Sequence, residues 1–304
     1  MKIRILVWLL AMAAAPAIAR QGAPGTFDYT VPSGRNYDKA EFRLWVPPAV
    51  ARVHAVLVLV PGSNGDGRPM AEDAFWQAFA TKHQLAIVAC RFTDKPHEQA
   101  FLEDYVKVSD GSGQALLDAV TALAAASKRP EIASAPFLMW GMSAGGQVDY
   151  EFAAWKPERV LAFVVNKGGV YYSALLPRAA RNVPALLFVG DKDLAFRVDT
   201  IAGLFAVNRR AGALWAYVVE PDTAHVVGRS RDLSAMFFED ILAIRLPDGV
   251  LKAVPEKSGF IGDLKAATFQ PIAAIPPPTV PTSWLPTERI ARAWQAVVNG
   301  TPFD

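Results

Sequence analysis

The chain has 304 residues, of which 52% are hydrophobic and 20% charged, the balance of a globular rather than a disordered protein. Lys and Arg number 31 against 29 Asp and Glu, a formal net charge of +2. A nucleic-acid binder needs a surplus of basic side chains to displace counterions from phosphates, so this composition argues against that class.

The first nineteen residues have the pattern of a signal peptide. Lys2 and Arg4 precede an apolar run over residues 5–15, and the small residues at 17 and 19 match a signal-peptidase site. The run is too short to span a bilayer, so we expect no membrane span. We expect cleavage after Ala19 and a secreted or periplasmic protein whose mature chain is formally neutral.

Beyond this segment, short apolar runs alternate with helical patterns. A loosely alternating stretch over residues 26–46 is typical of a hairpin at a sheet edge. We expect strands over residues 53–60, 85–90, 137–140, 160–165, 185–189 and 214–219, and helices over residues 71–83, 112–127, 144–155, 200–209 and 232–246. Unbroken apolar runs indicate strands covered on both faces, and the intervening helices imply right-handed crossovers. The sequence therefore predicts an α/β domain over residues 20–246, with a doubly wound, mostly parallel sheet.

Residues 247–304 form a Pro-rich extension with a different pattern. Residues 247–286 show neither helical nor strand periodicity over a sustained stretch, and residues 276–278 are three consecutive prolines. A short closing helix is expected from Thr287, where apolar residues recur at helical spacing. Trp284 and Trp294 are costly to leave in water, so we expect the extension to pack against the domain.

The strongest motif is Gly141-Met142-Ser143-Ala144-Gly145, a G-x-S-x-G pattern between a predicted strand and a predicted helix. A strand that turns abruptly into a helix makes its serine project, and the flanking glycines relieve the crowding. The unpaired N–H groups at the start of the helix suit a developing negative charge. Ser143 is therefore the candidate nucleophile, and the backbone N–H of Ala144 a candidate oxyanion donor.

A serine nucleophile needs a base, and the base needs an orienting acid. His225 follows the last predicted strand in a loop at its carboxyl end, where open α/β sheets place their sites, whereas the other histidines suit surface or packing roles. Gly190-Asp191-Lys192-Asp193 follows another such strand. Asp191 and Asp193 are both candidate acids, and both residues are also common turn formers.

In strand order, nucleophile elbow, acid loop and histidine loop, residues 53–246 resemble an α/β-hydrolase. The resemblance implies a serine hydrolase that cleaves carboxylic esters through an acyl-enzyme, with neither a metal nor an organic cofactor. It favours Asp193 over Asp191, because the acid of that superfamily commonly stands three residues after the loop glycine. The chain is also similar to secreted bacterial esterases related to feruloyl esterases and polyhydroxyalkanoate depolymerases.

A second oxyanion donor is expected in the loop after residues 53–60. Many members of the family carry His-Gly there, whereas this chain has Pro61 and Gly62, so the support of the loop must differ. We expect the N–H of Ser63 to be the donor, with Asn64 as the next candidate.

Substrate contacts are less sharply indicated. Tyr171 and Tyr172 follow the strand over residues 160–165 and, like Asn64, are candidate contacts, although packing roles suit the tyrosines equally. No large cap domain fits between that strand and the next, so an open cleft is expected for small-molecule or polymer-borne esters. A serine peptidase on the same fold and a non-catalytic binding protein that retains the fold are the alternatives.

Overall fold

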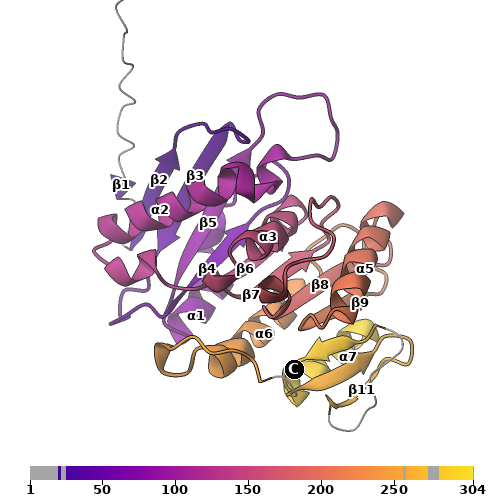
Figure 1. Cartoon of the computed structure of the whole chain (residues 1–304). Coiled ribbons are helices and arrows are strands. Elements are labelled where there is room, and N and C mark those ends of the chain that lie inside the picture. The colour runs from indigo at the N-terminus through magenta and orange to yellow at the C-terminus, as the bar shows by residue number, and fades with distance from the viewer. Residues whose placement is uncertain (1–19, 22–24, 256–257, 273–280, 304) are drawn as a thin grey trace, which may run out of the picture.

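A nine-stranded sheet lies at the centre of the molecule (Figure 1). The computed structural model describes residues 20–21, 25–255, 258–272 and 281–303, so the expected signal peptide and the three consecutive prolines lie outside the described residues. The strand order is β1-β2-β3-β5-β4-β6-β7-β8-β9. The strands are β1 (Arg20–Gln21), β2 (Thr26–Val31), β3 (Lys39–Trp45), β4 (Ala55–Val60), β5 (Leu85–Thr93), β6 (Phe137–Met142), β7 (Val160–Asn166), β8 (Ala185–Gly190) and β9 (Trp215–Glu220).

The sheet is mostly parallel, as predicted. β2 and β3 form the expected antiparallel hairpin, and β3 pairs antiparallel with β5. From β5 through β4, β6, β7 and β8 to β9 every pairing is parallel. The carboxyl ends of these six strands therefore meet at one edge of the sheet.

Helices cover both faces of the sheet. They are α1 (Ala74–Lys82), α2 (Ser112–Ala126), α3 (Ala144–Trp155), α4 (Arg178–Arg181), α5 (Ala195–Arg210) and α6 (Ser230–Arg245). Short 3-10 helices are η1 (Arg68–Glu72), η2 (Asp104–Val106), η3 (Val108–Asp110), η4 (Pro130–Ala133), η5 (Pro157–Arg159) and η6 (Pro247–Gly249). Helices α2, α3 and α5 share one apolar core, and α1 and α6 share the other (Figure 1). Within β4, Val56 and Val58 belong to the first core, and Leu57 and Leu59 to the second.

One predicted helix is divided in two. The pattern over residues 71–83 spans the end of η1 and all of α1, with Asp73 between them. The carboxylate of Asp73 accepts hydrogen bonds from the N–H groups of Phe75 and Trp76, 3.0 and 3.2 Å away. This N-cap satisfies amides that have no partner inside the helix, so α1 begins at Ala74.

The extension adds a small sheet that the sequence did not predict. Strands β10 (Phe260–Asp263), β11 (Thr268–Pro271) and β12 (Ser283–Leu285) pair antiparallel in the order β11-β10-β12. Each has only three or four residues, too few to show an alternating pattern. The expected closing helix is α7 (Glu288–Val298), and the Thr287 hydroxyl caps it by accepting the N–H of Ile290.

The extension packs against β9, the edge strand of the large sheet. The Ser283 hydroxyl accepts the N–H of Tyr217 at 2.9 Å and donates to its carbonyl oxygen at 3.2 Å. The indole N–H of Trp294 donates to the same oxygen at 2.8 Å. Trp284 and Trp294 are 2% and 0% exposed, in accordance with the cost of leaving an indole in water. The extension thus pairs polar groups of an edge that would otherwise be open to association.

We predict that Trp294→Ala lowers the free energy of unfolding by about 3–5 kcal/mol, because it empties a fully buried site and removes the donor to β9. Arg292→Ala, on the same helix but with a side chain 70% exposed, should change it by less than about 0.5 kcal/mol. Urea denaturation of both variants measures the difference. Equal effects would show that the extension contributes little to stability.

Candidate functional site

Ser143 stands in a strained turn between β6 and α3. Its φ and ψ angles are 56° and −122°, a region that residues with a side chain rarely adopt. A Cβ atom on Gly141 would overlap the backbone of Gly145, and one on Gly145 would overlap the carbonyl oxygen of Val60. Glycine is therefore required at both positions, and the strand–turn–helix context expected of a G-x-S-x-G motif is present.

Candidate oxyanion amides lie on two segments next to this turn, the start of α3 and the loop after β4. Ala144 begins α3, so its N–H belongs to the first turn, where amides have no partner inside the helix. Gly62 approaches from the other side, because a Cβ on it would lie 3.6 Å from the Cβ of Ser143. The N–H of Asn64 donates to the Tyr105 hydroxyl at 3.0 Å. The N–H of Ser63 has no hydrogen-bond partner within the described chain. Of Ser63 and Asn64, the two candidates for the second oxyanion donor, only Ser63 therefore has an amide free to bind an oxyanion.

His225 is paired with Asp193. Its Nδ1 lies 2.7 Å from Oδ2 of Asp193, whose side chain is 2% exposed. The other oxygen of Asp193 accepts the N–H of Leu194 at 2.7 Å and the Arg197 guanidinium at 3.0 Å. Burial opposes ionisation of Asp193, but hydrogen bonds from His225, Leu194 and Arg197 outweigh it and lower the pKa of the carboxyl. Asp193 is therefore ionised near neutral pH.

The second candidate acid has a different contact. Asp191 accepts the N–H of Thr223 at 3.2 Å and so helps to hold the histidine loop, but it makes no bond to His225. Ser143 Oγ has no hydrogen-bond partner among the described residues. Hydrogen bonds of this kind are often long before substrate binds.

A buried ion pair joins the end of β7 to the end of β9. Lys167, which follows β7, and Glu220, the last residue of β9, form a salt bridge with side chains that are 0% and 2% exposed. Lys167 Nζ also donates to Oδ1 of Asn166 at 3.1 Å. The second oxygen of Glu220 accepts the N–H of Arg229, beyond the histidine loop, at 2.5 Å. Both charges are thereby paired and hydrogen-bonded.

Asn166 joins this ion pair to the serine turn. Its carbonyl oxygen accepts the N–H of Ser143 at 2.7 Å, and its side-chain amide donates to the carbonyl oxygen of Val227 at 3.3 Å. Gly228 closes the loop at a φ of 58°, and a Cβ there would overlap the Glu220 carboxylate. One continuous polar network therefore fixes the segments on both sides of the site. Glu220 was not among the residues predicted from the sequence, although an acid that ends an apolar strand needs a partner.

The cavity beside Ser143 is small, about 20 Å³. It is lined by Phe101, Glu103, Ser143, Gln147, Gly169, Phe196 and Arg197, of which only Ser143 was predicted from the sequence. None of the candidate substrate contacts lines it. The side-chain oxygen of Asn64 accepts the N–H of Asp94 at 2.7 Å. Tyr171 packs edge-on against Tyr150, and Tyr172 is 44% exposed.

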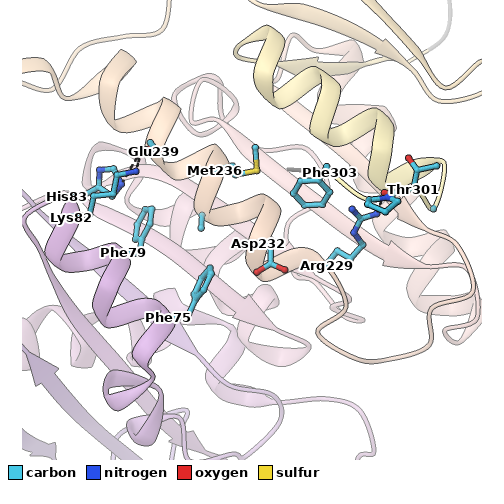
Figure 2. Close-up of a pocket in the computed structure, with 13 residues that line it drawn as sticks. Phe75, Phe79, Lys82, His83, Arg229, Asp232, Met236, Glu239, Thr301 and Phe303 are labelled. Carbon is cyan, nitrogen blue, oxygen red and sulfur yellow. Dashed lines mark hydrogen bonds and ion pairs between the residues drawn. The ribbon is translucent and has the colours of Figure 1, made fainter.

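A much larger pocket lies away from these residues (Figure 2). It measures about 700 Å³ and lies between α1, α6 and residues 300–303. Figure 2 shows Phe75 and Phe79 on α1 and Met236 on α6 among the residues that line it, and Phe303 lies beside Arg229. It contains neither Ser143 nor the His225–Asp193 pair, so the size of a pocket does not indicate where the candidate catalytic residues lie.

The described residues contain no group of three or more His, Cys, Asp or Glu side chains arranged to hold a metal ion. Burial, with a smaller effect from Asp149, raises the pKa of the Cys90 thiol well above its usual value, so this cysteine is protonated. In the same residues, no helix is both long enough and apolar enough to cross a bilayer.

Comparison with known proteins identifies the fold. No protein-family model and no curated protein matches the chain. Similar solved structures include a ferulic acid esterase (TM-score 0.52, 12% identity, 71% of this chain and 97% of that one). A poly(3-hydroxybutyrate) depolymerase from Bordetella parapertussis matches with a TM-score of 0.51 and 18% identity over 78% of this chain and 92% of that one. A Pyrobaculum calidifontis esterase has a TM-score of 0.50 and 17% identity over 72% and 84%. The chain has the α/β-hydrolase fold. The predicted resemblance is confirmed at this level, and Ser143, Asp193 and His225 follow β6, β8 and β9 of that fold.

The buried ion pair gives a test of the network. Glu220→Gln leaves the Lys167 charge buried without its counter-charge, so we expect a loss of about 3–5 kcal/mol in the free energy of unfolding. The double variant with Lys167→Met and Glu220→Gln removes both charges. Its loss in free energy of unfolding should therefore be smaller than the sum of the losses of the two single variants. Chemical denaturation of the four proteins measures this coupling.

Lys82→Met serves as the control, because it breaks the exposed pair between Lys82 and Glu239 and should cost at most about 1 kcal/mol. If the costs at Lys167 and Glu220 were additive, the two residues would not act as a pair.

Proposed function

We propose that this protein is a serine hydrolase that cleaves carboxylic esters through an acyl-enzyme. The observation that carries the proposal is the 2.7 Å pairing of His225 Nδ1 with a buried, ionised Asp193, in a fold that also holds Ser143 in a strained turn. An orienting acid and a histidine follow strands whose carboxyl ends meet at the edge of the sheet that carries the serine. This is the arrangement that activates a serine hydroxyl.

The proposal gives each proton transfer to a named atom. Because Nδ1–H of His225 donates to Asp193, Nε2 carries the lone pair and takes the proton of Ser143 Oγ as that oxygen attacks the ester carbon. The tetrahedral intermediate places its negative oxygen near the N–H groups of Ala144 and Ser63. The protonated His225 then gives its proton to the departing alcohol, which leaves the acyl group on Ser143. In the second half of the reaction, water attacks the acyl carbon while His225 takes its proton. His225 then returns the proton to Ser143 Oγ, and the carboxylic acid is released.

Ester specificity is the finer part of the proposal. Two of the similar structures are a ferulic acid esterase and a poly(3-hydroxybutyrate) depolymerase, and their names suggest esters rather than peptides as substrates here. Between β7 and β8 the chain forms only the four-residue helix α4. The absence of a large cap in this described stretch suits bulky or polymer-borne esters. The pattern of residues 1–19 supports export of the enzyme.

We predict that Ser143→Ala lowers ester turnover by about 10⁴- to 10⁶-fold and prevents labelling by a fluorophosphonate probe. The thermal unfolding of the variant should remain cooperative. Hydrolysis of p-nitrophenyl esters and of peptide p-nitroanilides measures activity and separates an esterase from a peptidase. A native protein that neither reacts with the probe nor cleaves either substrate would instead be a binding protein.

The two acids are expected to differ in effect. Asp193→Asn removes the acceptor that holds the tautomer of His225, so turnover should fall by roughly 10⁴-fold. Asp191→Asn is the matched control and should have a mild effect, because Asp191 bonds only a backbone amide. Steady-state kinetics on the same ester compares them. A larger loss for Asp191→Asn would overturn the assignment.

A further inference from the structure

Two polar side chains with hydrogen-bonding groups still free line the small cavity beside Ser143. Glu103 is 8% exposed, and its carboxylate makes no hydrogen bond or ion pair within the described chain. Gln147, on α3, is 4% exposed. Its Oε1 accepts the N–H of Gly169 at 2.8 Å, whereas its Nε2 is buried without a partner.

The unpaired amide group of Gln147 is costly in this state. A buried donor that has left water without gaining a partner destabilises the protein. The amide of Gln147 is held in its orientation by Gly169, because a flipped amide would turn a donor toward the Gly169 N–H. The cavity therefore presents a carboxylate acceptor from Glu103 and an amide donor from Gln147.

We propose that this cavity binds a hydroxyl group of the ester substrate, close to the bond that is cleaved. A hydroxyl donates to Glu103 and accepts from Gln147, so it satisfies both groups at once. An ammonium group has no acceptor and leaves Gln147 unpaired, while a carboxylate is repelled by Glu103. The volume of about 20 Å³ suits one group of the size of water. This inference rests on the proposed function, because Ser143 lines the same cavity.

The rest of the lining is aromatic and charge-balanced. The rings of Phe101 and Phe196 lie 5.9 Å apart, and both residues are exposed. The Arg197 guanidinium lies 5.6 and 5.2 Å from their centroids and is paired with Asp193. The charge of Arg197 is thus balanced by Asp193 and not by Glu103. The carboxylate of Glu103 remains the free acceptor of the cavity.

Matched esters test the proposal and locate the hydroxyl. One arm compares p-nitrophenyl 3-hydroxybutyrate with p-nitrophenyl butyrate, which places the hydroxyl on the acyl part. The other compares 2-hydroxyethyl butyrate with ethyl butyrate, which places it on the alcohol part. We expect the native protein to prefer the hydroxylated ester in one arm by about tenfold to a hundredfold in kcat/KM. Glu103→Gln, which replaces a carboxylate oxygen by a donor, should reduce this ratio to less than about threefold.

Glu98→Gln is the control, because Glu98 lies in the same loop but is exposed, and it should leave the ratio unchanged. A native protein that labels with fluorophosphonate but shows no preference in either arm contradicts the hydroxyl site alone. A preference that survives Glu103→Gln contradicts it too, and the cavity then holds only water. A native protein that neither labels nor cleaves any of the four esters contradicts the proposed function, and this inference with it.

Discussion

Lys167 and Glu220 carry opposite charges in the interior, and the arrangement of the site depends on their contact. Removing two charges from water costs several kcal/mol, which is recovered only when every remaining polar atom is bonded. Here Asn166 and the N–H of Arg229 complete the set. Because Asn166 also bonds the N–H of Ser143 and the carbonyl oxygen of Val227, it connects the serine turn to the histidine loop. A buried network of this kind gives the site a defined geometry rather than extra stability.

The remaining constraints act on either side of this network. Steric limits at Gly141 and Gly145 hold the serine turn in a strained conformation, which packing of β6 and α3 maintains. The C-terminal extension acts on β9, the strand that leads to Glu220 and the histidine loop, through the Ser283 and Trp294 bonds to Tyr217. A segment far along the chain thereby supports the strand that places His225. Its contribution to the site is indirect and passes through the backbone of β9.

The sequence predicted what periodicity and local motifs encode. Apolar runs located the six parallel strands, and the G-x-S-x-G pattern located the serine turn, because both signals lie within a few neighbouring residues. It did not predict β10, β11 and β12, which are too short for a pattern. Nor did it indicate that Glu103 and Gln147 share a cavity, or that Glu220 pairs with Lys167. These contacts join residues tens of positions apart, and only the folded chain defines them.

The structure of the protein after reaction with a fluorophosphonate tests the central claim most directly, because the bound phosphonyl group resembles the tetrahedral intermediate. We predict a single adduct on Ser143 Oγ. We also expect the phosphoryl oxygen to lie about 3 Å from the N–H groups of Ala144 and Ser63, with His225 Nε2 facing the adduct. An adduct on another residue, or a phosphoryl oxygen bound by neither amide, would contradict the account.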